Sequence, residues 1–163
     1  MGIRSGRLHD AVTTAQLSAK AAKFTGTLVR LYNSAQSIAN CSQTIITFND
    51  IVYNELGAFN AGAPTKLTVP TGVTKVQVYA FSRWAINSTG IRLLIILKNT
   101  DYAGGLYVTN PATDRTENTI ISPILNVTPG DYFTVSVYQS SGGALDFAGD
   151  ANITPYFCMM KVD

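Results

Sequence analysis

Two stretches near the C-terminus decide the fold, DYFTVSVYQ (131–139) and TPYFCMMKV (154–162). In the first, apolar residues occupy every second position, which is the period of a strand that packs on one face. In the second, neighbouring residues from Tyr156 to Met160 are apolar, so both faces of the strand are apolar. Such a strand must be covered on both faces. In a short antiparallel all-β chain, one cover is the second sheet of the domain, and we expect the other to be another subunit.

Short strand-like apolar segments recur from Ser42 onward, separated by Gly and Pro turns, as in a β-sandwich. The Ile91–Leu97 segment is again apolar on both faces, and Pro123 predicts an edge strand or a bulge. The pairs Gly104-Gly105 and Gly142-Gly143 predict hairpin turns, and Pro129-Gly130 predicts a tight turn. We predict strands at about 44–48, 51–54, 66–69, 74–84, 91–97, 119–127, 131–139 and 154–162.

The first 40 residues differ from the rest of the 163-residue chain. A helical pattern runs from Asp10 to Phe24, and a polar linker is expected over 33–40. We therefore divide the chain into an extended, partly helical N-terminal arm, 1–40, and a β domain, 41–163. A basic arm on a neutral body suggests docking onto an acidic surface, with a solvated tail as the alternative. The charges of the arm are Arg4, Arg7, Lys20, Lys23 and Arg30 against Asp10.

Composition excludes several classes of protein. The chain is 46% hydrophobic and only 13% charged, so much of its surface is expected to be buried in contacts or made of small polar residues. A net charge of +2 is too small to indicate nucleic-acid binding. No apolar run approaches the roughly 18 residues of a membrane span, and no signal peptide is visible. Cys41 and Cys158 are predicted to be reduced, buried thiols.

Side chains for catalysis are scarce. His9 is the only histidine and lies in the arm, so neither a nucleophile–histidine pair nor a zinc site is expected in the β domain. We therefore expect no enzyme activity and no cofactor. Carboxylates in loops, if they meet, are candidate Ca²⁺ ligands, with solvated acids as the alternative. These are Asp146 with Asp150, or Asp101, Asp114 and Glu117.

Aromatic residues fall into two groups. Tyr79 and Phe81 share a face of the long 74–84 strand and are assigned to the core or to a threefold contact, where Tyr156 and Met160 of the last strand are expected to join them. The second group follows that strand and is the candidate for an exposed surface that recognises host glycans, with burial or subunit contacts as the alternative. It comprises Trp84, Tyr102 and Tyr107, the last two expected in a loop.

Several segments resemble the C1q-like jelly roll, which is shared with the tumour-necrosis-factor superfamily. They are ITFNDIVYNE (46–55), Phe59, LTVPTGV (67–73), DYFTV (131–135), Gly143-Ala144-Leu145 and Phe157. The resemblance runs from Cys41 to the end of the chain; collagen-like repeats are absent, and residues 1–40 have no counterpart. It implies an all-β jelly-roll sandwich of ten strands that assembles as a homotrimer.

A jelly roll with a basic arm and no leader is similar to small virion structural proteins of tailed bacteriophages. That similarity implies a trimeric block, made in the host cytoplasm, that decorates or cements the particle through contacts with major capsid or tail proteins. The expected anchor is Ile3, Arg4, Arg7 and Leu8. The alternative is a receptor- or glycan-binding head of a tail fibre or tail tip.

Overall fold

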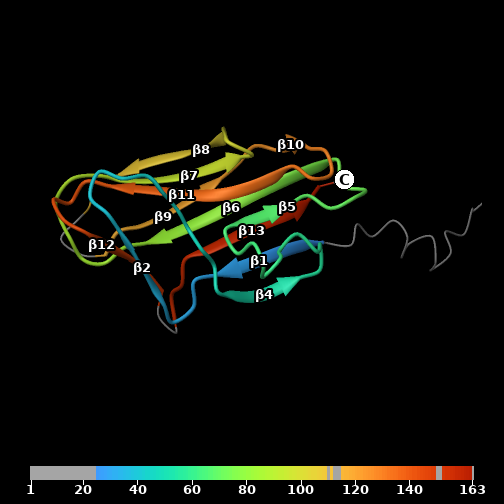
Figure 1. Cartoon of the computed structure of the whole chain (residues 1–163). Coiled ribbons are helices and arrows are strands. Elements are labelled where there is room, and N and C mark those ends of the chain that lie inside the picture. The colour runs from blue at the N-terminus through green and yellow to red at the C-terminus, as the bar shows by residue number, and fades with distance from the viewer. Residues whose placement is uncertain (1–24, 110, 112–114, 150–151, 163) are drawn as a thin grey trace, which may run out of the picture.

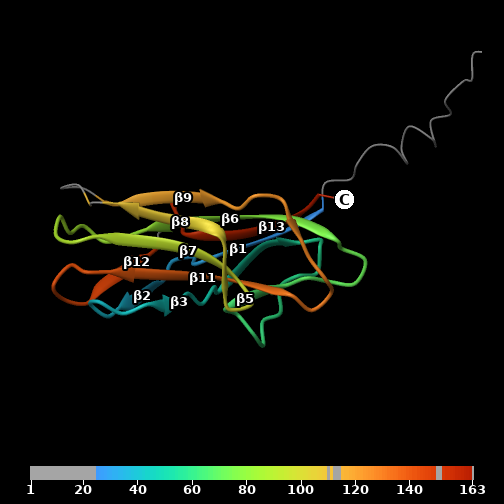
Figure 2. The same cartoon turned by 90° about the horizontal axis from the view of Figure 1, so that it is seen from above.

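The computed structural model describes residues 25–109, 111, 115–149 and 152–162, with side chains described except at 104–108. In this part of the chain, antiparallel strands form two stacked sheets, which Figure 2 shows as two layers. A short third sheet closes one end of the sandwich (Figure 1). Within the described residues, no helix is long and apolar enough to cross a membrane.

The first layer, named here the β6 sheet, has the strand order β10-β6-β13-β1-β4, and β9 also pairs with β6. The second layer, the β7 sheet, has the order β3-β11-β7-β8, and β5 also pairs with β11. The bounds of the first are β10 (Leu125–Asn126), β6 (Lys75–Arg83), β13 (Tyr156–Lys161), β1 (Gly26–Arg30), β4 (Asp50–Asn54) and β9 (Glu117–Ile121). Those of the second are β3 (Thr44–Ile45), β11 (Tyr132–Gln139), β7 (Arg92–Lys98), β8 (Asp101–Thr109) and β5 (Lys66–Thr68). The third sheet pairs β2 (Ala35–Ile38) with β12 (Leu145–Ala148).

The core lies between the two layers and follows the alternation of the strands. On the β6 sheet the inward residues include Val78 and Phe157, and on the β7 sheet they include Leu94 and Val135, all four fully or almost fully buried. Burial of this apolar surface is the main force that holds the layers together. The all-β sandwich predicted from the sequence is confirmed.

The N-terminal boundary of the sandwich differs from the prediction. β1 pairs with both β4 and β13, Val29 on it is fully buried, and β2 occupies half of the expected linker 33–40. The prediction of a linker over 33–40 is therefore wrong, and the predicted domain boundary at residue 41 falls inside the sandwich. The signal in β1 is only five residues long, and its partners are distant in the chain. The helical pattern at 10–24 lies outside the described residues.

The β7–β8 hairpin also differs from the prediction. Gly104-Gly105 lies within β8, where the register with β7 shifts between Ile96 and Leu97, and the hairpin turn includes Asn99, which has φ +56°. The glycines therefore accompany a bulge instead of a turn.

The predictions from proline and glycine elsewhere agree with the structure. Pro123 separates β9 from β10. Gly130 has φ +94° in a turn that is closed by a hydrogen bond from the Asp131 N–H to Thr128 O. Strand β12 was not predicted.

Candidate self-association surface

The outer face of the β6 sheet carries a continuous row of uncharged, mostly apolar side chains. Strand pairing places Ile121, Tyr79, Cys158, Leu28 and Tyr53 side by side across β9, β6, β13, β1 and β4. On β9, β6, β13 and β1 these residues point outward because their neighbours along each strand are buried, and Tyr53 of β4 pairs with Leu28. We call this set the outer row. No two of its five strands are consecutive in the chain, so only the fold assembles it.

A second set of residues flanks the outer row on the same face. Phe81 and Tyr156 pair across β6 and β13, and their rings stack with centroids 5.4 Å apart. Further along β13, Met160 pairs with Gln77. Stacked aromatic pairs of this kind are typical of protein interfaces as well as of cores.

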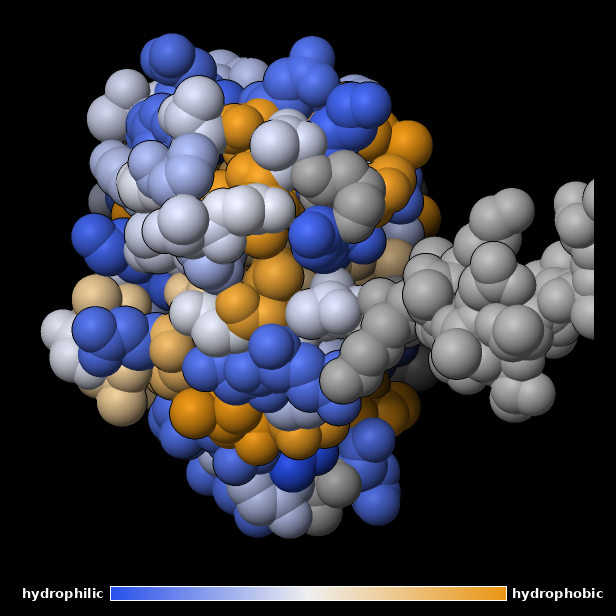
Figure 3. Space-filling view, turned by 90° about the vertical axis from the view of Figure 1, so that its right-hand side faces the viewer, coloured by the Kyte–Doolittle hydropathy of each residue, from blue (hydrophilic) through white to orange (hydrophobic). Residues whose placement is uncertain are grey.

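Exposure varies along the outer row. Cys158 is buried, Leu28, Tyr53 and Tyr79 are half-buried, and Ile121 at the β9 edge is 53% exposed. Next to Ile121, Ile124 is 57% exposed. At the other edge, Ile51 and Val52 of β4 are exposed, and Figure 3 shows apolar groups gathered at the height of β4 at this end of the molecule.

The outer row is electrically neutral at physiological pH. Burial, assisted by a hydrogen bond of 3.7 Å between the Tyr53 hydroxyl and Cys158 Sγ, raises the pKa of Tyr53 to about 12. Burial likewise raises the pKa of the Cys158 thiol. Charge lies at the border, where Arg30 forms an ion pair with Asp50. An apolar centre with a charged border is typical of a surface that contacts another protein.

The structure brings together all four residues predicted for the trimer contact. Tyr79, Phe81, Tyr156 and Met160 lie on one face of two adjacent strands, and all four are half-buried in the single chain. Leu28, Tyr53 and Ile121 were not predicted from the sequence. Leu28 was assigned to the arm, because the adjacent apolar residues Leu28 and Val29 show no polar–apolar alternation. Whether these residues contact another subunit stays a prediction.

The other strand that is apolar on both faces behaves differently. On the outward face of β7, Ile95 is 2% exposed and Leu97 is 9% exposed in the single chain. β7 is paired on both sides, with β11 and with β8. Ile95 and Leu97 are therefore buried without another subunit, contrary to the prediction, whereas Leu93 on the same face is half-buried.

The residues predicted to form a ligand surface are not grouped together. Trp84 is fully buried and packs edge-on against Phe147, with ring centroids 5.4 Å apart, so its proposed exposure is wrong. Tyr102 is 66% exposed, but it and Tyr107 belong to strand β8 instead of a loop. The side chain of Tyr107 lies outside the described part of the structure.

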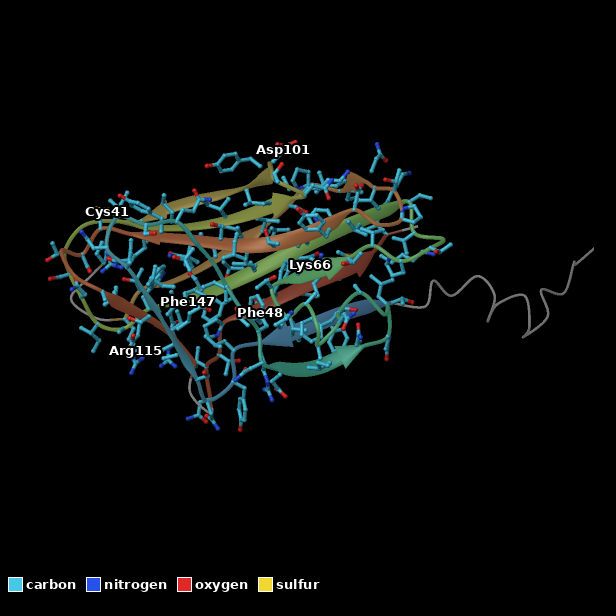
Figure 4. All side chains as sticks on the ribbon, in the orientation of Figure 1. Cys41, Phe48, Lys66, Asp101, Arg115 and Phe147 are labelled. Atoms are coloured by element: carbon cyan, nitrogen blue, oxygen red, sulfur yellow. The ribbon has the colours of Figure 1, made fainter. Side chains whose placement is uncertain are left out.

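The predicted anchor of Ile3, Arg4, Arg7 and Leu8 lies wholly outside the described residues. So do Asp114 and Asp150, two of the carboxylates considered as Ca²⁺ ligands. Of the others, Asp101 lies on β8 and Asp146 on β12, and Figure 4 shows Asp101 and the β12 residue Phe147 at separate places. Glu117 pairs with Arg83. The described residues contain no group of three metal-ligating side chains.

The two cysteines are free thiols. Cys158 is buried, as predicted, whereas Cys41 is exposed, which contradicts the prediction that both are buried. Cys41 lies in the turn after β2, with φ +56° and its N–H bonded to Gln139 O.

No family model and no curated protein sequence matches the chain. Solved structures do. Murine APRIL at pH 5.0 matches with a TM-score of 0.57 and 12% identity, over 86% of this chain and 100% of that one. Eiger TNF from S. frugiperda matches with a TM-score of 0.53 and 10% identity, over 86% of this chain and 93% of that one.

The fold is a TNF-like jelly roll. At identities this low the similarity establishes the fold and nothing further. It confirms the jelly-roll part of the resemblance seen in the sequence, and it places the outer row on a sheet of a known architecture.

Proposed function

We propose that this jelly roll is a non-enzymatic structural protein that assembles as a homotrimer through the outer face of its β6 sheet. The observation that carries the proposal is the outer row, which crosses five strands without a charged side chain. The C1q-like and TNF-like resemblance of the sequence supports three copies, because it implies threefold assembly.

In a threefold ring each copy contacts its two neighbours through two different surfaces. The β9–β10 edge, with the exposed side chains of Ile121 and Ile124, supplies one apolar surface. The half-buried side chains around Tyr156 and Met160 supply the other. Contact of the first with the second on the next copy removes apolar area from water on both and closes the ring.

The first experiment tests the trimer. Tyr79→Glu places a charge in the middle of the outer row, and we expect the trimer of the unaltered protein to become a monomer with unchanged circular dichroism. Sedimentation equilibrium at micromolar concentration measures this directly. The matched control is Tyr102→Glu, which makes the same change at an exposed site on the β7 sheet and is expected to leave the trimer intact. An unaltered protein that sediments as a monomer would refute the proposal.

For the role of the trimer, we propose attachment to the surface of a tailed-bacteriophage particle, on the capsid or the tail, through the N-terminal residues. The basic character of this segment and the virion-protein resemblance support the proposal. Three weak anchors on one rigid body raise the effective concentration of each anchor and slow release.

The second experiment tests attachment. Because β1 begins at Gly26, the truncation must stop at residue 24, since removal of 1–40 would delete two strands of the sandwich. The chain 25–163 is expected to remain trimeric but to lose binding to particles that lack the protein, as measured by co-sedimentation. The full chain with Arg4→Glu and Arg7→Glu is expected to bind more weakly. Full binding by the truncated trimer would contradict an N-terminal anchor.

A receptor- or glycan-binding head is the second candidate function. One observation favours it: Tyr102 is 66% exposed on β8 and can stack on a sugar ring. Loss of host adsorption in Tyr102→Ala, with the trimer retained, is the result expected from this function.

A further inference from the structure

One end of the sandwich interior contains three polar side chains, Trp84, Asn118 and Arg92, which we call the buried donor cluster. Trp84 and Arg92 are 0% exposed and Asn118 is 6% exposed. They come from both layers: Trp84 follows β6, Asn118 lies on β9 beside it, and Arg92 begins β7. Alternation along the strands directs all three inward, because Arg92 is followed two residues later by Leu94, and Asn118 by Ile120, both in the core.

Arg92 brings a positive charge into this interior. Its two Nη atoms donate to the carbonyl oxygens of Asn87, Thr89 and Ile91 and to Asn87 Oδ1, at 2.9–3.2 Å. All four acceptors are neutral. Among the described residues no carboxylate pairs with Arg92, and burial lowers the pKa of its guanidinium. A buried charge without a counter-charge is costly, so a source of negative charge is expected nearby.

Each member of the cluster also has an N–H group without an acceptor in the described part of the chain. These groups are Arg92 Nε, Trp84 Nε1 and Asn118 Nδ2. Indole and guanidinium nitrogens are donors only, so rotating the side chain cannot turn them into acceptors. The Arg92 guanidinium carbon lies over the face of the Trp84 indole, 5.8 Å from the ring centre, so these two residues are neighbours in the interior. Buried donors are nearly always bonded, so three at one end of the sandwich interior require acceptors that the described part of the chain does not supply.

We propose that the buried donor cluster binds one small monovalent anion of the size of chloride. Such an ion accepts several N–H bonds at once and supplies the negative charge that Arg92 lacks. A water molecule is a poorer fit, because it carries no charge and adds two protons that themselves need acceptors. The bound ion offsets the positive charge of Arg92, and Arg92 in turn holds the loop 87–91 at this end of the sandwich through its hydrogen bonds.

The chain reports on this site directly, because Trp84 is its only tryptophan. Sodium bromide is titrated into the full-length protein in place of sodium gluconate at constant ionic strength, and indole fluorescence is recorded. We expect saturable quenching by bromide that added chloride reverses. Acrylamide, a neutral quencher, is expected to quench weakly because the indole is buried. Quenching by bromide that is absent, or linear and insensitive to chloride, would overturn the proposal.

Two variants test the location of the ion. Asn118→Asp places a fixed carboxylate beside Arg92 and is expected to abolish the saturable response while the fold, followed by circular dichroism, is kept. Asn126→Asp makes the same change on the exposed strand β10 and is expected to keep the response. A response retained in Asn118→Asp would contradict this site.

The unaltered protein provides a check that does not depend on how the variants fold. Crystals soaked in bromide are expected to show an anomalous peak within hydrogen-bonding distance of Arg92 Nε and Trp84 Nε1. No peak at this place, or density for water alone, would refute the proposal.

Discussion

The outer faces of the two sheets make an informative comparison, because each contains a strand that is apolar on both sides. On the β7 sheet, the outward residues Ile95 and Leu97 are at most 9% exposed in the single chain, and only Leu93 on that face of β7 is half-buried. On the β6 sheet, Tyr79 and Tyr156 remain half-buried and Ile121 is 53% exposed. An apolar outward face in the sequence therefore does not by itself require a partner. What matters is how much of it the chain's own neighbouring strands cover.

The largest expected effect comes from placing a charge on each face in turn. Ile95→Asp buries an unpaired carboxylate and is expected to lower the free energy of unfolding by about 3–5 kcal/mol. Ile121→Asp, at an exposed position, is expected to change it by less than about 1 kcal/mol while weakening self-association. Both changes are made in the monomeric Tyr79→Glu protein, where urea denaturation measures the free energy of unfolding separately from self-association. Equal destabilisation by both changes would break the distinction between the faces.

A smaller effect is expected at a clamp that fixes one end of the β7 sheet. Asp131 accepts hydrogen bonds from Lys98 Nζ at 2.9 Å, from the Thr128 N–H at 3.0 Å and from Asn99 Nδ2 at 3.1 Å. The bond from Lys98 above all, then those from Thr128 and Asn99, hold the pKa of the Asp131 carboxyl well below its usual range. The clamp ties the β7–β8 hairpin to the turn before β11.

We expect Asp131→Asn to lower the free energy of unfolding by about 1–3 kcal/mol at neutral pH, because charge-assisted hydrogen bonds are lost. A depressed pKa stabilises the fold above the unfolded-state value of about 4, and this stabilisation fades as pH falls below it toward the folded pKa. The difference between the variant and the unaltered protein should therefore shrink from pH 5 to pH 2. A constant difference over that range would show that charge is not the cause. The association state is expected to stay the same.

The smallest expected effect is a difference in reaction rate between the two thiols, which involves no change in stability. Cys41 is exposed and should react promptly with a thiol reagent, whereas Cys158 is buried under Tyr53, with its pKa raised by burial, and should react slowly. One fast equivalent out of two is therefore expected in the native protein, and both after unfolding. Rapid reaction of both thiols would indicate that the outer row opens readily.

Much of the fold was accessible from the sequence. Period-two alternation identified β11, and runs that are apolar on both faces identified β7 and β13, because these strands carry enough residues for the pattern to stand out. β6 was predicted as part of the strand 74–84. β1, β2 and β12 were not predicted, since each has only four or five residues and depends on a distant partner. The nine-residue β8 was also not predicted, because it was interpreted as a loop. Gly104-Gly105 was misread as a turn because a bulge and a turn use glycine for similar reasons.

The candidate surface was only partly accessible. Tyr79, Phe81, Tyr156 and Met160 could be chosen from their strands, since each strand showed which of its faces they share. Leu28 could not, because its role depends on β1 pairing with β13. Trp84 was misplaced, since an aromatic residue at a strand end is buried or exposed according to what packs above it.

The sequence by itself determined the all-β class, the positions of the long strands and the scarcity of charge, because alternation and composition are local properties. Only the tertiary structure decided which apolar faces remain partly open, and which buried donors share one interior end of the sandwich. Those features depend on strand order and register, which bring together residues more than 100 positions apart, such as Leu28 and Cys158. The burial of a side chain depends on the residues that pack against it, and local sequence patterns do not specify which residues those are.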